Sequence, residues 1–317
     1  MRDYDALEPV LHPYLGFTSP HNFRSPSVST DSAGFRRSEF GGRAMATESV
    51  EADEQFGVAL GGSFTFGVGA THDRHSVVSR LGEEAGMPFL NRAVRAGNSL
   101  QELLAALPLL PRASQVVVCT GVNNLALSAW SARTYDDLGP LFYDEAIATL
   151  AGRRLDELGA QAGAAGFRET LRSGLSAVRS RPRPSDPPRP QLDPQSIASA
   201  AASRHLRDLE LVAAATGPDA RLIFVVQPFV PDEHAGAIGS VERRADWWQS
   251  TIEFVSRQWP SYVEELRSGC EALGVRSRVL WSSEFEGRAY VDRVHMTDHG
   301  QRQAARRIVE VMADGPA

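Results

Sequence analysis

The sequence predicts a three-layer α/β/α fold in which a mostly parallel, five-stranded sheet lies between layers of helices. Short apolar runs alternate with segments of helical apolar period along most of the chain. Of its 317 residues, 42% are apolar and 23% are charged, a composition typical of a globular protein with a full core. Because strand–helix alternation makes crossover connections, it favours parallel strands covered by helices on both faces.

The first strand is expected at 56–63 (FGVALGGS), where an apolar run ends in glycines. A helix is expected at 75–86, because apolar residues recur there with a period of 3.6 residues. The remaining elements follow the same alternation: strands at 89–94, 115–121, 221–228 and 277–283, and helices at 99–110 and 298–313. Together they indicate a single main domain at 55–317, flavodoxin-like in character.

Two segments do not follow this alternation. Residues 1–54 are rich in Ser, Pro, Gly and aromatic residues without a helical period, so we expect an N-terminal extended arm over the domain surface. An insertion is expected at about 145–205, between the third and fourth strands. Its proline-dense part, 181–194, cannot hold a helix, whereas alanine-rich helical patterns flank it. The insertion is either a lid over the site or a helical side pack.

Composition excludes several classes of function. The net charge of −6 argues against nucleic acid as a partner, because phosphate binding needs a basic surface. The chain contains no lysine, which excludes Schiff-base catalysis and a Walker-type phosphate loop. With two cysteines, no signal-peptide pattern and no run of apolar residues long enough for a membrane span, we expect a cytoplasmic protein. Its oligomeric state is left open.

Candidate functional residues follow the predicted strands, because ligands of open parallel sheets bind beyond the carboxyl ends of the strands. Ser63 follows the first strand and Gly97 the second, and Asn123 and Asn124 follow the third. After the last strand comes VDRVHMTDHG at 291–300, in which Asp292 precedes His295 by three residues. A serine, a histidine, an aspartate and several amide donors are therefore expected to converge at one edge of the sheet.

The sequence here resembles the SGNH or GDSL-type serine hydrolases. GGSFTFG is similar to the serine block of that family, AGNS to the glycine block, TGVNN to the GxN block and DRVH to the DxxH block. The four blocks occur in family order between 57 and 312. Gly62 replaces the aspartate of GDS and Asn124 that of GxND, as in a bacterial GGS branch of such hydrolases, which the motifs HPYLGF and GFR also resemble.

The resemblance implies acyl-ester hydrolysis through an acyl-enzyme, on a small-molecule, glycan or natural-product ester. Ser63 would be the nucleophile, His295 the general base and Asp292 the residue that orients the imidazole. The oxyanion hole would consist of the N–H groups of Ser63 and Gly97 and the side-chain amide of Asn123. Neither a cofactor nor a metal is expected.

Two further residues are candidates for contact with substrate. Asn124 lies beside the predicted oxyanion donor Asn123, and Phe229 lies just after the fourth predicted strand. For Phe229 the default interpretation is core packing.

Other readings of the same residues stay open. Ser63 alone could be a helix cap, and Gly97 and Asn123 could be turn residues. Asp292, His295 and His299 have a conceivable metal spacing, although no HExxH motif accompanies them. An acyltransferase would use the same serine, histidine and aspartate, and a non-catalytic binding protein could keep the same fold.

Overall fold

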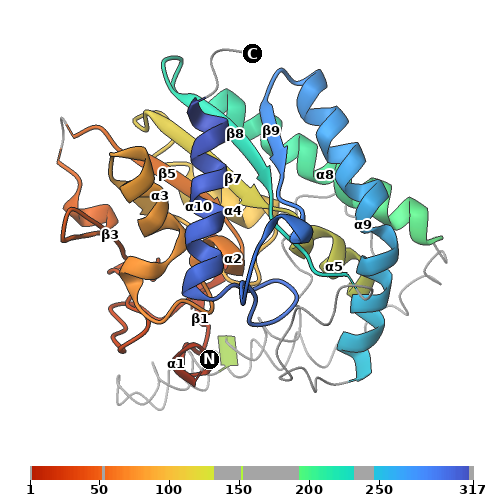
Figure 1. Ribbon diagram of the computed structural model, residues 1–317, viewed down its shortest axis with the longest axis horizontal. Coiled ribbons are helices and arrows are strands. Elements are labelled where there is room, and N and C mark those ends of the chain that lie inside the picture. Colours follow the sequence, from red (N-terminus) through yellow and green to blue (C-terminus); the bar gives the residue numbers. More distant parts are fainter. Residues whose placement is uncertain (1, 52–53, 132–150, 153–192, 232–245, 314–317) are drawn as a thin grey trace, which may run out of the picture.

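The computed structural model describes residues 2–51, 54–131, 151–152, 193–231 and 246–313 (Figure 1). Its centre is a five-stranded, all-parallel sheet of order β6-β5-β7-β8-β9. The strands are β5 (Gly57–Gly61), β6 (Phe89–Asn91), β7 (Gln115–Thr120), β8 (Arg221–Val226) and β9 (Arg276–Val279). In chain order this arrangement is 2-1-3-4-5, the flavodoxin-like order. The fold class expected from the sequence is confirmed.

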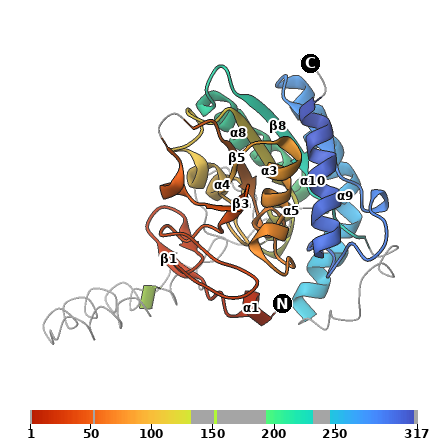
Figure 2. The ribbon, with the colours of Figure 1, turned by 60° about the vertical axis from the view of Figure 1, so that its left-hand side comes forward.

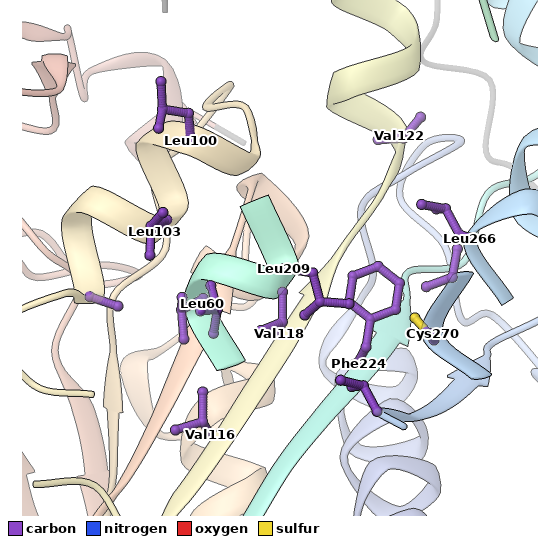
Figure 3. Packing of buried hydrophobic residues seen from close by; sticks show 14 of the residues in the cluster. Leu60, Leu100, Leu103, Val116, Val118, Val122, Leu209, Phe224, Leu266 and Cys270 are labelled. Carbon is purple, nitrogen blue, oxygen red and sulfur yellow. The ribbon is translucent and has the colours of Figure 1, made fainter. Parts of the chain in front are cut away.

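Helices cover both faces of the sheet (Figures 1 and 2). One layer contains α4 (Ser99–Ala106), α5 (Val122–Ser131), α8 (Pro194–Ala215) and α9 (Asp246–Ala272), and the other contains α2 (Ser63–Phe66), α3 (Val77–Ala85) and α10 (Asp298–Ala313). Strand side chains alternate between the layers: Leu60, Val118 and Phe224 pack under the first layer (Figure 3), and Ala59, Val117 and Val225 under the second. The alternation follows from the two-residue period of a strand.

Local sequence explains where the helices on either side of β6 begin and end. The Ser76 side chain accepts a hydrogen bond from Ser79 N and so caps α3, which ends at Gly86 in a left-handed conformation (φ 69°). Asn98 and Gln101 form a reciprocal capping box at the start of α4. The strand–helix units expected from the sequence therefore lie within a few residues of the observed ones.

Residues 2–51 form short elements rather than one extended chain. They contain α1 (Arg2–Asp5) and two hairpins, β1 (Val10–His12) with β2 (Gly16–Thr18), and β3 (Ser38–Phe40) with β4 (Arg43–Met45). Three 3-10 turns complete the described elements: η1 (Thr47–Ser49), η2 (Asp73–His75) and η4 (Ser282–Glu284). The region buries Leu7, Leu15 and Phe35 almost fully, so it packs as part of the domain.

A buried arginine fastens this N-terminal region to the main domain. Arg36 pairs with Asp73 at 2.9 Å and donates to Tyr4 Oη at 2.9 Å and to Gly67 O at 2.7 Å. A guanidinium with no exposed surface needs such partners, because an unpaired buried charge is costly. Arg36 therefore connects the N-terminal region to the end of α2.

Of the insertion expected at 145–205, most lies outside the described residues, including the proline-dense segment up to residue 192. The helical pattern at its end corresponds to α8, whose N-cap Asp193 accepts from the N–H groups of Gln195 and Ser196. None of the helices in the described part of the chain has the length and apolar character to cross a membrane.

Candidate active site

Ser63 opens the short helix α2 directly after β5. Thr65 Oγ1 donates to Cys119 O at 2.5 Å and ties α2 to β7, while Phe64 and Phe66 pack into separate apolar clusters. A Cβ on Gly62 would lie 2.5 Å from Asn123 Nδ2, so a side chain at this position would displace the Asn123 amide. This close approach gives a physical reason for glycine where the related motif has aspartate.

Asp292 and His295 lie on the loop between β9 and α10. The loop is fixed to the segment after β8, because Val230 N donates to Arg293 O at 2.9 Å and Arg293 donates back to Val230 O at 3.1 Å. The fully buried Gln301 links it to the α2 region by donating to both Met296 O and Val68 O. These bonds hold the loop beside Ser63, which precedes it by more than 200 residues in the chain.

The three side chains form a continuous chain of hydrogen bonds. His295 Nδ1 lies 2.7 Å from Asp292 Oδ2, and His295 Nε2 lies 2.8 Å from Ser63 Oγ. With the Nδ1 proton directed at the carboxylate, Nε2 accepts from the serine hydroxyl. Asp292 Oδ1 also accepts from the N–H groups of Val294 and His295 at 3.0 and 2.8 Å.

The carboxylate of Asp292 is buried and nevertheless ionised. Burial alone raises the pKa of Asp292, but the charge of His295, the bond to its ring and the two backbone N–H donors together lower that pKa to about 2. The net direction is set by the partners rather than by burial. Asp292 is therefore a fixed negative charge behind the imidazole at any pH near neutrality.

Asn123 reaches the same place from the start of α5. Its Nδ2 donates to Gly97 O at 2.8 Å, which uses one of the two amide hydrogens and leaves the other. Ser63 follows β5 and Asn123 follows β7, and the chain order of the strands reverses between these neighbours. Such a switch point is where open α/β sheets leave a crevice for ligands.

A cavity of about 430 Å³ opens at this crevice and is lined by Ser63, Asn123 and His295. Its other walls come from α5, α9, the loop of Val294, the loop between β6 and α4, and the N-terminal region. The N-terminal region contributes six lining residues: Tyr4, Asp5, Pro9, Phe17, Thr18 and Ser19. The sequence pattern gave no sign that the N-terminal region lines this cavity.

The N–H of Gly97, expected from the sequence in the oxyanion hole, is bonded within its own loop. Its N–H donates to Val94 O at 2.9 Å, and its carbonyl accepts from Asn123. Among the described residues of this loop, Arg95 and Ala96 line the cavity and Gly97 does not. Ala96 has a positive φ of 57°, which is uncommon for a residue with a Cβ and is not visible in the sequence.

Asn124 and Phe229, the two further candidates for contact with substrate, lie elsewhere, and Phe229 follows its default interpretation as a core residue. Asn124 is buried and exchanges hydrogen bonds with Ser99, accepting from its N–H at 2.9 Å and donating to its Oγ at 2.7 Å. Phe229 is 2% exposed and packs on Trp259, with ring centroids 5.3 Å apart. Neither is among the described residues that line the cavity.

A metal cluster was the competing interpretation of Asp292, His295 and His299. Within the described ranges, no three His, Cys, Asp or Glu side chains gather as ligands of an ion. His295 instead has both ring nitrogens in hydrogen bonds, to Asp292 and to Ser63.

No family model matches this chain, and no curated protein matches its sequence. Several solved structures are similar to it. A carbohydrate acetylesterase from Sinorhizobium meliloti, Est24, is 10% identical over 82% of this chain and 99% of its own, with a TM-score of 0.45. An extracellular lipase from Streptomyces rimosus is 11% identical over 81% and 98%, with a TM-score of 0.45.

A third similar structure is a putative lipolytic protein of the G-D-S-L family from Desulfitobacterium hafniense. It is 13% identical over 81% of this chain and 99% of its own, with a TM-score of 0.41. The similar structures thus include esterases and lipases, and one is described by the family that the sequence motifs resemble.

Proposed function

We propose that this chain is a serine ester hydrolase of the SGNH type, with Ser63 as its nucleophile. The observation that carries the proposal is the chain of hydrogen bonds from Asp292 through His295 to Ser63, which ends at the wall of a cavity. A serine hydroxyl is a weak nucleophile until an adjacent base accepts its proton, and this arrangement supplies such a base with a third group that orients it.

The first half of the reaction follows from these contacts. As Ser63 Oγ attacks the ester carbonyl, its proton passes to His295 Nε2, and the negative charge of Asp292 stabilises the imidazolium. The carbonyl oxygen becomes an oxyanion. When the tetrahedral intermediate collapses, His295 returns the proton to the departing alcohol and the acyl group stays on Ser63.

In the second half, water takes the place of the alcohol. His295 accepts a proton from the water as it attacks the acyl-enzyme, a second oxyanion forms, and the acid departs as Ser63 regains its proton. The same imidazole therefore serves first as base and then as acid in each half-reaction.

Two donors would stabilise the oxyanion in this mechanism. The N–H of Ser63 opens α2, so it has no acceptor within the helix, and Asn123 Nδ2 keeps one hydrogen beyond its bond to Gly97 O. Gly97 contributes by fixing the orientation of the Asn123 amide. A direct role for the Gly97 N–H would require it to leave Val94 O.

The proposal can be tested with a fluorophosphonate probe followed by peptide mapping. We expect a covalent adduct on Ser63, none on the buried Ser99, and none anywhere in Ser63→Ala. Excess EDTA should leave both the labelling and the hydrolysis of a p-nitrophenyl ester unchanged. Circular dichroism checks that the wild-type protein is folded. Absence of label at Ser63 in the folded protein would refute the nucleophile assignment.

A further inference from the structure

The cavity beside Ser63 has two chemically different halves. The helix half is formed by Val122, Ala126 and Leu127 on α5, Ile252 and Val255 on α9, and Val294. The arm half is formed by the N-terminal region together with Val68, Arg95 and Ala96. In Figure 1, α1 and β1 lie on one side of α2, and α5 and α9 on the other.

Every described side chain of the helix half is apolar. Val122 and Ala126 are four residues apart and Ile252 and Val255 three apart, so each helix turns one face to the cavity. Val122, Ile252, Val255 and Val294 also belong to the main core cluster, which makes this wall continuous with the protein interior. None of its six side chains can hydrogen-bond a ligand.

The helix half also begins at the reacting groups. Val122 directly precedes Asn123, and Val294 directly precedes His295. A group bonded to the carbonyl carbon that Ser63 attacks would therefore extend along this apolar wall. An acetyl group would leave most of the wall in contact with water, whereas a longer chain would cover it.

We propose that the helix half binds the acyl chain of a medium-chain ester. A cavity of about 430 Å³ lies within the size range of small-molecule sites and accommodates a chain on the order of six to ten carbons. The inference rests on the proposed function and adds to it the class of acid that the serine accepts.

The arm half suits the other side of the ester bond. It contains Asp5, Thr18, Ser19 and Arg95, whose groups can hydrogen-bond the hydroxyls of a polar alcohol. Arg95 donates to Tyr4 O at 3.0 Å and to Leu7 O, so it also fixes the arm as a wall of the site. The arm half also contains apolar residues such as Phe17 and Val68, but it has hydrogen-bonding groups that the helix half lacks, so the polar alcohol is matched to the arm half and the acyl chain to the helix half.

The first test is a series of p-nitrophenyl esters from acetyl to dodecanoyl with the wild-type protein. Because each buried methylene contributes a nearly constant increment, kcat/KM should rise about fourfold per added carbon and then level off near the octanoyl ester. The rise from acetyl to hexanoyl should be on the order of 10²-fold. A series that peaks at acetyl, or is flat, would overturn the assignment.

The second test fills the helix half with a larger side chain. Ala126→Phe should lower the ratio of kcat/KM for octanoyl over acetyl ester by at least about tenfold. Ala129→Phe is the matched control, since Ala129 is also half-buried on α5 but does not line the cavity. If Ala126→Phe does not fold, Val122→Thr places a hydroxyl in the same wall at similar volume and should lower the ratio too. An equal ratio in the wall variants and the control contradicts the proposal.

A binding measurement separates this inference from the proposed function. In Ser63→Ala, calorimetry should show octanamide binding at least about 10²-fold more tightly than acetamide, and Ala126→Phe should weaken it. Lack of labelling and of turnover in the wild type would refute the hydrolase while this binding stood. Absence of octanamide binding in a protein whose Ser63 is labelled would refute the acyl pocket alone.

Discussion

Two sites in the described part of the molecule place a histidine and an aspartate three residues apart, and only in one does the imidazole contact a serine hydroxyl. DRVH at 292–295 lies on a loop at the cavity, where Asp292 and Ser63 occupy both ring nitrogens of His295. HLRD at 205–208 lies on α8 inside the domain, in a buried polar cluster formed by Ser99, Glu102, Thr120, His205, Asp208 and Tyr262. Residue type and spacing are nearly mirrored.

The hydrogen bonds of the buried polar cluster run in other directions. Ser99 Oγ donates to Asp208 at 2.5 Å, but His205 Nδ1 bonds to Tyr262 Oη at 3.0 Å, and Tyr262 in turn donates to Gly121 O. His205 Nε2 has no hydrogen-bond partner among the described residues. No imidazole therefore lies between the serine and the aspartate, and the buried serine is not activated.

The charge states of the two sites differ as well. At the cavity, partners lower the pKa of Asp292 to about 2 despite its burial. In the buried polar cluster, burial raises the pKa of Glu102 to about 8, with a smaller contribution from Asp208, and lowers the pKa of His205 to about 3. Burial with few partners neutralises ionisable groups, whereas burial with matched partners keeps the charge that catalysis needs.

The largest expected effect comes from removing either reacting group at the cavity. Ser63→Ala and His295→Ala should each lower kcat by on the order of 10⁶, and the double variant should be no worse, because the residues act as one unit. Ser99→Ala should keep kcat within about tenfold although it also loses a serine bonded to an aspartate. Steady-state kinetics on a p-nitrophenyl ester decide the matter, and turnover within tenfold of wild type in Ser63→Ala would remove the distinction between the two sites.

The next effect concerns Asn123, the proposed oxyanion donor. Asn123→Ala should lower kcat by roughly 10² to 10³ with little change in KM, since the lost donor acts on charge that develops in the transition state. Asn124→Ala is the matched comparison, because the neighbouring amide bonds to Ser99 and should affect the melting temperature more than kcat. A normal kcat in folded Asn123→Ala would assign Asn123 a structural role.

A third prediction uses the pH dependence of the buried polar cluster. The folded protein keeps the Glu102 proton up to a pKa of about 8, whereas the unfolded chain releases it near 4.5. Between these values the unfolded state binds fewer protons, so the free energy of unfolding decreases as pH rises. Glu102→Gln removes this loss and should stabilise the protein by on the order of 3 kcal/mol at pH 7.

Urea denaturation of both proteins at pH 5 and pH 7 checks this prediction. The stabilising effect should shrink towards zero as pH falls below 4.5, because both states then hold the proton. His205 acts in the opposite sense: its pKa of about 3 means that stability is lost as pH falls below 6.5. A stability difference independent of pH would show that Glu102 is ionised in the folded protein.

The smallest effect is expected for the tyrosine of the buried polar cluster. Tyr262→Phe leaves His205 Nδ1 and Gly121 O without their common partner, which should cost about 1 to 3 kcal/mol in the free energy of unfolding. Because Tyr262 is not among the described residues of the cavity wall, kcat should stay within a few-fold of wild type. A large loss of kcat at unchanged stability would connect the buried polar cluster to catalysis.

Much of the fold could be predicted because its signals are local. The apolar run at 115–121 corresponds to β7, and the helical period at 75–86 corresponds to α3. A strand buried on both faces is a continuous apolar run, whereas a helix buried on one face has apolar residues every three or four positions, so a few residues suffice to tell them apart. That Ser63, Asn123 and His295 meet at one cavity could be expected for a similar reason. Each lies at the end of a recognisable apolar run or in the loop that follows one. Because the carboxyl ends of parallel strands meet at one edge of the sheet, residues in these positions come together.

Assignments that depend on side-chain direction were less predictable. Asn124 and Asn123 are adjacent in sequence, yet on a helix they point about 100° apart, and only Asn123 faces the cavity. Phe229 follows a strand as expected but turns into the core against Trp259. Gly97 is one residue beyond the position that lines the cavity, where Ala96 takes a left-handed conformation.

The sequence by itself determined the parallel sheet, the order of its strand–helix units and the residues at the strand ends, because hydrophobic period and turn chemistry act within a few residues. The tertiary structure alone decided how those ends meet and what surrounds them. Ser63 bonds to His295, Phe17 closes one wall of the cavity, and His205 bonds to Tyr262 in the interior. Each of these contacts joins segments that are far apart in the chain. Such contacts depend on how whole layers pack, and no local pattern records them.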